Sequence, residues 1–344
     1  MSLSSELKQY ARGRLGFHLV GITGAEPFQQ AELDMLRWLG EGHQGEMAWL
    51  NAARARLACR PRELLPGAES LIVVAVAYRS DDAPAAGIAR YARGGDYHAV
   101  MKARLRELAR WLAEHCGRAV GARVFVDDGP LMERDAAIRA GLGFRGKNTN
   151  LLTPIGSFVF LGALLTDVSL EVDRPLAKDC GTCRLCLDAC PTGALISPYH
   201  LAAERCIAYL TIEHRGPIPP DLRPRMGEWI FGCDVCQDVC PYNASTRHRP
   251  APWPELSPRP PPSVTEVLAL DDSGFSRTFR GSPIKRAKRR GLARNAAIAL
   301  GNTGAGREAL HHAAQRDPDP VVREAADWAL TVAAAQQVVG DPRA

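Results

Sequence analysis

The pattern of apolar residues changes twice along the chain, and it divides the sequence into three parts. In the first part, apolar residues recur at helical spacing in residues 4–15 and 100–115, which predicts amphipathic helices. Short runs of β-type residues at 70–78, 123–126 and 157–165 are bounded by Gly, Pro or Asp and predict strands. Helices that alternate with strands predict an α/β arrangement for this first part.

The second and third parts differ from the first in composition. Residues 173–248 hold eight of the ten cysteines, and residues 249–264 contain seven prolines, which predicts a stiff, extended linker. Residues 265–337 are Ala-rich and helical, and the tetrapeptides RNAA and REAA recur in them 29 residues apart, as in a HEAT-type repeat. Because about three repeats are needed to bury a continuous core, this part should pack against the rest of the protein.

Length and composition indicate an ordinary globular protein. The 344 residues predict two or three domains, and 46% of them are apolar and 24% charged. The N-terminus lacks the apolar core of a signal peptide, and the longest apolar runs, 71–77 and 158–165, are too short to cross a bilayer. We therefore expect a cytoplasmic protein with no membrane partner, in which clustered cysteines are metal ligands or redox groups rather than disulfides.

The cysteines of the second part follow the spacing of a bacterial ferredoxin. Cys180, Cys183, Cys186 and Cys190 form C-x2-C-x2-C-x3-C-P, in which the fourth cysteine typically binds the other of two clusters. A second run lacks its first cysteine, because Ile230 stands there, and Cys206 completes the count. The pattern predicts two [4Fe–4S] clusters, whose ligand sets are Cys180, Cys183, Cys186 and Cys240 for one and Cys190, Cys206, Cys233 and Cys236 for the other.

Two structural zinc sites are the alternative interpretation of these cysteines. Zinc ribbons usually present C-x2-C pairs that a long spacer separates, whereas three successive short steps ending in Cys-Pro favour iron–sulfur clusters. Cys59 and Cys116 lie outside the runs, and we expect them to be ordinary thiols. Two clusters carry electrons but do not define a reaction, so the first 170 or so residues should hold the site that uses the electrons.

The net charge of +5 comes from one short segment. Residues 273–294 contain eight Lys or Arg and no acid, and the remainder carries 35 basic against 38 acidic residues. Such a segment is either a solvated charged face or a contact surface for a phosphate backbone. The second interpretation predicts tRNA contacts for Lys285, Arg286, Lys288, Arg289, Arg290 and Arg294.

Several long stretches resemble the epoxyqueuosine reductase family. They are RPRELLPG at 60–67, RYARGGDYH at 90–98, VFVDDGPLMERDAA at 124–137, GLGFRGKNTNLL at 141–152, CIAYLTIEHRGPIP at 206–219 and GCDVCQDVCPYN at 232–243. The resemblance implies a cobalamin-dependent, two-cluster reductase that removes the epoxide oxygen of epoxyqueuosine at the wobble position of tRNA. It also implies an external low-potential electron donor, and we expect a monomer.

The resemblance assigns roles to individual residues in the first part. Asp127 becomes the proton donor, with Asp128 as the second choice, although without the family an acid at this position indicates a turn or a cap. Contacts to cobalamin fall on Arg54, Arg90, Asp127, Lys147 and Asn148, of which the arginines could equally be solvated surface charges. The chain has no D-x-H-x-x-G motif, in agreement with base-off cobalamin, and we interpret His98 and His200 as ordinary polar residues.

These inferences combine into one predicted architecture and two rival functions. The fold class is α+β: an α/β cobalamin-binding domain at 1–172, a diferredoxin-like domain at 173–248, the linker at 249–264 and HEAT-like tRNA-binding helices at 265–337. One rival is a dehalogenase-like cobalamin reductase of a small molecule, which gives no reason for the basic segment. The other is a non-catalytic electron carrier of the diferredoxin type, which would bind no cobalamin.

Overall fold

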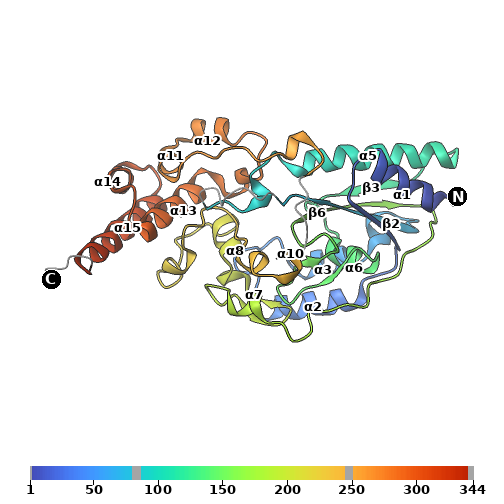
Figure 1. Ribbon diagram of the computed structural model, residues 1–344, viewed down its shortest axis with the longest axis horizontal. Coiled ribbons are helices and arrows are strands. Elements are labelled where there is room, and N and C mark those ends of the chain that lie inside the picture. Colours follow the sequence, from blue (N-terminus) through green and yellow to red (C-terminus); the bar gives the residue numbers. More distant parts are fainter. Residues whose placement is uncertain (1, 80–86, 245–250, 340–344) are drawn as a thin grey trace.

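The protein consists of three successive regions. The computed structural model describes residues 2–79, 87–244 and 251–339. An α/β region at the N-terminal end is followed by a middle region of short helices and hairpins and by a helical C-terminal region (Figure 1). Helices α1 and α15 lie at opposite ends of the long axis, and the middle region lies between the N-terminal and C-terminal regions.

One four-stranded antiparallel sheet organises the N-terminal region. Its strand order is β1-β2-β6-β3, and its strands are β1 (Leu19–Gly24), β2 (Ser70–Ala77), β6 (Val159–Thr166) and β3 (Ala122–Phe125). Strand β2 lies between β1 and β6, with Ile72 opposite Leu164, and all of its residues are buried. A continuous apolar run is what a strand covered on both faces requires, and β2 has one.

Helices cover both faces of this sheet. Side chains alternate along β2, so successive residues of this strand point to opposite faces and pack in two different cores. Ile72 and Val74 pack in the core with α1 and α5, whereas Leu71 and Val73 face the other core. The helices of the first face are α1 (Leu3–Gly13) and α5 (Tyr97–Cys116), and those of the second are α2 (Gln29–Gly40), α3 (Ala52–Ala58), α4 (Pro61–Leu64) and α6 (Glu133–Arg139). The sheet is therefore the middle layer of three (Figure 1).

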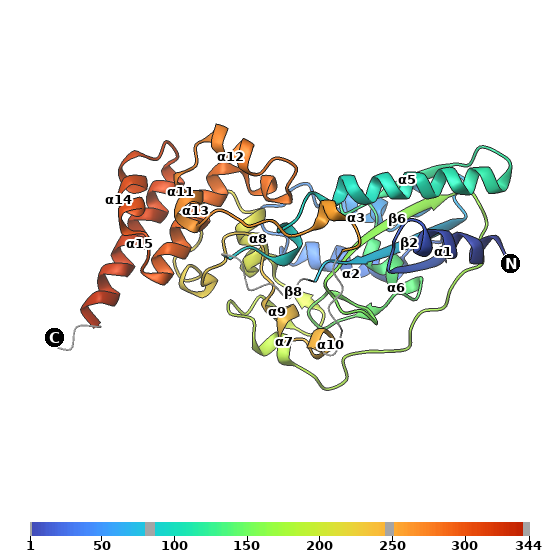
Figure 2. The same cartoon turned by 45° about the horizontal axis from the view of Figure 1, so that its top comes forward.

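The middle region has little regular structure, as a chain wrapped around cofactors requires. An extended stretch leaves β6 and runs along the outside of the molecule to α7 (Figure 2). Helices α7, α9 and α10 lie together in that view, and α7 contacts α9. The elements are β4 (Phe144–Arg145), β5 (Leu151–Leu152), α7 (Leu185–Asp188), β7 (Leu195–Ser197), β8 (His200–Leu201), α8 (Ile207–Ile212), α9 (Val235–Asp238) and α10 (Pro241–Ala244), with single 3-10 turns at Arg90–Ala92, Ala203–Arg205 and Pro224–Met226.

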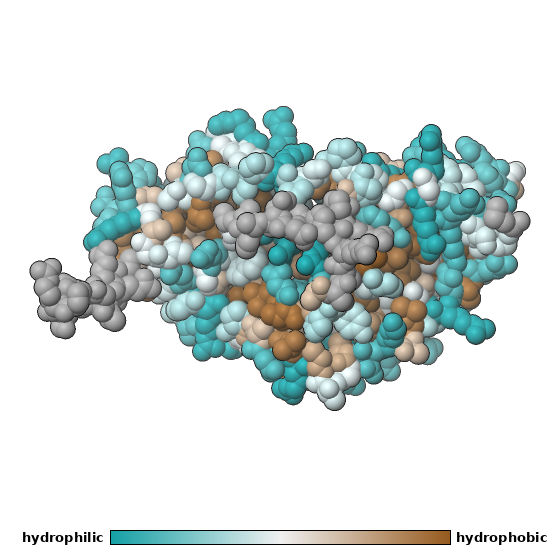
Figure 3. All heavy atoms as spheres, in the orientation of Figure 1, coloured by the Kyte–Doolittle hydropathy of each residue, from teal (hydrophilic) through white to brown (hydrophobic). Residues whose placement is uncertain are grey.

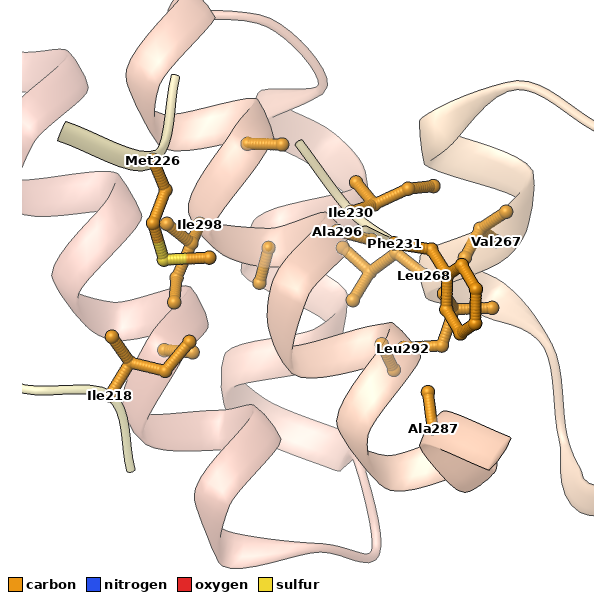
Figure 4. Close-up of a cluster of buried hydrophobic side chains, with 14 of the residues drawn as sticks. Ile218, Met226, Ile230, Phe231, Val267, Leu268, Ala287, Leu292, Ala296 and Ile298 are labelled. Carbon is orange, nitrogen blue, oxygen red and sulfur yellow. The ribbon is translucent and has the colours of Figure 1, made fainter. Parts of the chain in front are cut away.

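The C-terminal helices share one hydrophobic core with the middle region. Ile218, Met226 and Phe231 pack against Leu292 and Ile298 of α13, which confirms that this part does not stand alone (Figure 4). The elements are α11 (Val264–Ala269), α12 (Asp272–Thr278), a 3-10 turn at Pro283–Ala287, α13 (Lys288–Thr303), α14 (Arg307–Arg316) and α15 (Pro320–Val339).

The Pro-rich segment is anchored to the N-terminal region. Trp253 is 5% exposed, and its indole nitrogen donates a hydrogen bond of 3.0 Å to the carbonyl of Leu15. The Trp253 ring packs edge-on against Phe17, and Arg104 lies 4.2 Å from its centre. Residues 251–264 therefore pack against the sheet domain and connect it to the C-terminal helices. The proline content alone had predicted an extended spacer.

The surface is mainly hydrophilic. On the face shown in Figure 3, hydrophobic residues gather in the lower centre, around α7 and α8 of Figure 1. Leu185 of α7 is 50% exposed and Tyr199, beside β8, is 43% exposed. Within the described residues, no helix combines the length and the apolarity needed to cross a bilayer.

Candidate functional site

The two cysteine runs form similar local structures. Each run contains a short helix, α7 or α9, which includes the cysteine that precedes the Cys-Pro step, Cys186 or Cys236. Tight turns bring the thiols of a run close together; for example, the amide of Cys183 donates to the carbonyl of Cys180 at 3.1 Å. Cys206 caps the beginning of α8 from a separate part of the chain.

The two predicted ligand sets are called here the first cysteine group (Cys180, Cys183, Cys186 and Cys240) and the second cysteine group (Cys190, Cys206, Cys233 and Cys236). Burial raises the pKa of Cys186, and the charges of Cys180 and Cys240 raise it further. Burial likewise raises the pKa of Cys233 to about 12, with Cys206 and Cys190 among the contributing neighbours. Burial also raises the pKa of Cys236, and its charged neighbours include Cys186, so the two groups lie close to each other.

The GKN loop binds to both cysteine groups. The Lys147 ammonium donates to the carbonyls of Gly181 (2.6 Å) and Cys183 (2.9 Å). The Asn148 amide donates to the carbonyl of Cys236 at 3.2 Å, and Asn150 contacts the sulfur of Cys236 at 3.8 Å. Asn150 was missed in the sequence, although it lies only two residues beyond the predicted pair.

Arg90 also contacts a cysteine loop. Its guanidinium pairs with Asp234 at 3.1 Å and with Asp238 at 2.7 Å, both in the second run, and lies 5.0 Å from the centre of the Phe158 ring. The structure thus places Arg90, Lys147 and Asn148 as supports of the cysteine loops.

Asp127 follows β3 in a left-handed backbone conformation, with φ of 52°. The Tyr97 hydroxyl donates to its carboxylate at 2.5 Å, and the Asp127 amide donates to the Glu133 carboxylate at 2.9 Å. Asp128 pairs with Lys102 instead. Tyr97 and Glu133 are site residues that the sequence did not reveal, since neither belongs to a motif with its own chemistry.

The surroundings of Asp127 are suited to holding protons. Burial, followed by the charge of Asp127, raises the pKa of Glu133 to about 8. The same two causes raise the pKa of Tyr97, which therefore stays protonated and donates. Asp127 thus lies between Tyr97 and Glu133, two groups that carry protons at neutral pH.

Asp127 lies close to the second cysteine group and to the basic segment. Burial raises the pKa of Tyr91, and the charges of Asp127 and, more weakly, Asp234 raise it too, so this tyrosine is near both. Arg286 pairs with Glu213 at 2.8 Å, and these contacts, followed by the charge of Asp127, raise its pKa. The geometry agrees: the centre of the Tyr91 ring lies 6.3 Å from that of Tyr97, which donates to Asp127, and 6.0 Å from that of Phe231, two residues before Cys233.

The basic segment divides into exposed and structural residues. Lys285, Arg286, Lys288 and Arg290 are exposed. Arg289 is directed inward and pairs with Asp317. The prediction for Arg294 is corrected: it is 1% exposed and donates to the carbonyls of Leu210, His214 and Gly216, so a tRNA cannot reach it.

The remaining candidates lie apart from the cysteines. Arg54 is half-buried, 5.2 Å from the centre of the Trp49 ring, which Arg286 also approaches. The His98 ring lies 2.6 Å from Asp96, the capping residue of α5. Cys59 is fully buried, and burial raises its pKa to about 12, so it is an inert thiol as expected.

Fold and site together define an iron–sulfur protein, in which a module for two clusters is joined to an α/β domain with an acidic site. Residues 179–243 match the family described as "4Fe-4S double cluster binding domain", and residues 59–128 match "Epoxyqueuosine reductase QueG, DUF1730". The chain is 40% identical to the epoxyqueuosine reductase of Alicycliphilus denitrificans, over 96% of this chain and 99% of that protein. The epoxyqueuosine reductase of Escherichia coli K12 is 39% identical, over 98% of this chain and 90% of that protein. The chain belongs to the epoxyqueuosine reductase family.

Solved structures of this family have the same fold. A crystal structure of epoxyqueuosine reductase with a tRNA-Tyr epoxyqueuosine-modified stem loop matches 96% of this chain and 90% of its own, with a TM-score of 0.87 and 32% identity. The enzyme of Bacillus subtilis, in a structure whose catalytic aspartate loop is swung out of the active site, matches over the same shares with a TM-score of 0.87 and 33% identity.

Proposed function

We propose that this protein reduces epoxyqueuosine to queuosine in tRNA, in the cytoplasm. The observation that carries the proposal is the convergence of three features. Asp127, the second cysteine group and Arg286 of the basic segment lie close enough for their charges to affect one another or the same tyrosine. The family relatives named above are epoxyqueuosine reductases, and one of them was crystallised with the modified stem loop.

The two thiol groups are the ligand sets of two [4Fe–4S] clusters. One set is Cys180, Cys183, Cys186 and Cys240, and the other is Cys190, Cys206, Cys233 and Cys236. When bound, the clusters supply single electrons at low potential. The first set lies beside exposed Leu185 and Tyr199, which makes it the entry point for an external donor, and the second lies toward Asp127.

Cobalamin is the electron acceptor that we assign between the second cluster and Asp127. The described residues fit a base-off cofactor, because the His98 ring, which stacks on Tyr97, is held by the Asp96 carboxylate at 2.6 Å. When bound, cobalamin supplies a strongly reducing cobalt centre. Arg54 keeps its proposed contact with the cofactor, while Arg90, Lys147 and Asn148 hold the cysteine loops beside it.

Asp127 is the proton donor of the reaction. Converting the epoxide to an alkene takes two electrons and two protons, breaks both C–O bonds and releases the oxygen as water. The oxygen freed first is an alkoxide, which a carboxylic acid protonates. Tyr97 orients the Asp127 carboxyl group, and Glu133 holds its amide and carries a proton at neutral pH. A catalytic aspartate loop in the Bacillus subtilis relative supports this role.

The C-terminal helices are HEAT-like and bind the tRNA. Lys285, Arg286, Lys288 and Arg290 are exposed and contact phosphates, while Arg289 and Arg294 hold the helices in place. The modified base leaves the anticodon stack to reach the site, as enzymes acting on a base generally require. A small-molecule reductase gives no reason for this group of exposed cations, of which Arg286 pairs with Glu213 and Arg290 with Asp319.

The test is turnover by the reconstituted protein. Anaerobic protein with both clusters is incubated with cobalamin, reductant and an epoxyqueuosine-containing stem loop, and the nucleosides are analysed by mass spectrometry. We expect queuosine from the wild type and none from Asp127→Ala with unchanged cluster absorbance. Absence of queuosine from the wild type refutes the proposal, and a fully active Asp127→Ala variant refutes the role of Asp127.

A further inference from the structure

A second group of potential metal ligands lies at the junction of the N-terminal and middle regions. Glu41 and His43 belong to the loop after α2, and His200 belongs to β8. One ligand atom of each residue lies within 4.8 Å of the other two, and this is the only such trio within the described residues. None of the three takes part in the reaction proposed above.

The ring nitrogens of His43 and His200 are oriented as those of metal-binding histidines usually are. Nδ1 of His43 contacts the Glu204 carboxylate at 3.2 Å, which leaves its Nε2 facing Glu41 Oε2 at 3.6 Å. A ligating histidine commonly donates its other ring N–H to a carboxylate in this way. Nε2 of His200 lies 2.8 Å from the same Oε2 but is buried and has no hydrogen-bond partner. An imidazole nitrogen that faces a carboxylate without hydrogen-bond alignment is free to bind a cation between them.

We propose that Glu41, His43 and His200 bind a divalent transition-metal ion of the zinc class. Zn–N distances of about 2.0–2.1 Å place ligands on a tetrahedral ion about 3.4 Å apart. The contacts of 2.8 Å and 3.6 Å bracket that spacing. Two imidazoles and one carboxylate suit zinc and its neighbours better than Mg²⁺ or Ca²⁺, and water fills the fourth position. His200, which the sequence indicated to be an ordinary polar residue, becomes a ligand.

The metal joins two regions that already contact each other. Near the trio, the Ala203 amide donates to the His43 carbonyl at 3.0 Å, and the Trp38 indole donates to the Leu201 carbonyl at 2.6 Å. The hairpin that carries His200 lies between Cys190 and Cys206 in the sequence. An ion at this position fixes the hairpin of the second cysteine group to the α2 loop.

The test uses protein with both clusters in place, so that none of the eight ligand cysteines is open to zinc. The protein, with about eight iron atoms per chain, is dialysed against Zn²⁺, and bound metals are counted by mass spectrometry. We expect one zinc per chain with unchanged iron. Zinc X-ray absorption should show only nitrogen and oxygen neighbours near 2.0–2.1 Å, whereas sulfur at about 2.3 Å overturns the proposal.

Variants locate the ion. His200→Ala and Glu41→Gln should abolish zinc binding, and Glu204→Gln should weaken it about 10–100-fold, as loss of an orienting carboxylate usually does. His312→Ala removes an exposed histidine of α14 and should bind zinc like the wild type. Zinc retained in His200→Ala, or a wild type that binds none, overturns the proposal. If His200→Ala loses iron, the proposal is judged on the zinc content of Glu41→Gln and on the zinc X-ray absorption spectrum of the wild type.

Discussion

Arg294→Met separates a structural role from an RNA-binding role. Methionine keeps much of the side-chain volume but removes the donors that satisfy the carbonyls of Leu210, His214 and Gly216. Each buried acceptor left unpaired costs about 1–3 kcal/mol. Removing a buried charge offsets part of that cost, so we expect the free energy of unfolding to fall by about 3 kcal/mol. At about 2 °C per kcal/mol for a chain of this size, Tm should fall by about 6 °C.

Far-UV circular dichroism of anaerobic protein with matched iron content measures this loss, and binding to a tRNA stem loop is measured in parallel. Lys285→Met is the matched control, because Lys285 is an exposed cation of the same segment. Lys285→Met should leave Tm unchanged within about 1 °C and weaken binding of the stem loop. It should also reduce the slope of log affinity against log salt concentration by about one. An Arg294→Met protein with wild-type Tm and weakened tRNA binding would refute the reasoning.

Three further predictions concern the site itself. Tyr97→Phe removes the hydrogen bond to Asp127 and should lower turnover about 10–100-fold with both clusters intact, measured as queuosine formed per minute; unchanged turnover would show that Tyr97 does not orient the acid. Glu133 has a pKa of about 8 in the folded protein against an ordinary 4.5, so the folded state binds more protons between these values and stability falls as pH rises through this range. Glu133→Gln should therefore flatten the decline of Tm between pH 6 and pH 9, and an unchanged slope would contradict the assigned pKa. Lys147→Met should leave two carbonyls of the first cysteine loop unpaired and speed iron loss in air, followed by absorbance, whereas Lys178→Met, an exposed lysine nearby, should not.

Local patterns predicted several elements of the N-terminal region. The runs at 70–78 and 157–165 became β2 and β6, because apolar stretches of this length suit strands covered on both faces. The helix at 100–115 was found within α5, whose ends are marked by Asp96 and by Gly117 in a left-handed conformation. Strand order was beyond the sequence, since β2 pairs with β6 across more than 80 residues.

For the site, the sequence by itself determined the chemistry but not the surroundings. Cysteine spacing predicted two sets of four thiols, because short steps keep the first cysteines of a run together while its Cys-Pro cysteine binds the other cluster. The stretch around Asp127 resembled the family and so predicted an acid. Only the tertiary structure decided that Tyr97 and Glu133 flank that acid, since α5 brings Tyr97 to it from 30 residues away and the turn into α6 brings Glu133 back to it. It also decided that Arg294 is a core residue while Lys285 is not. Identical charges acquire different roles because burial, which depends on packing of the whole chain, decides whether a cation meets solvent or backbone carbonyls.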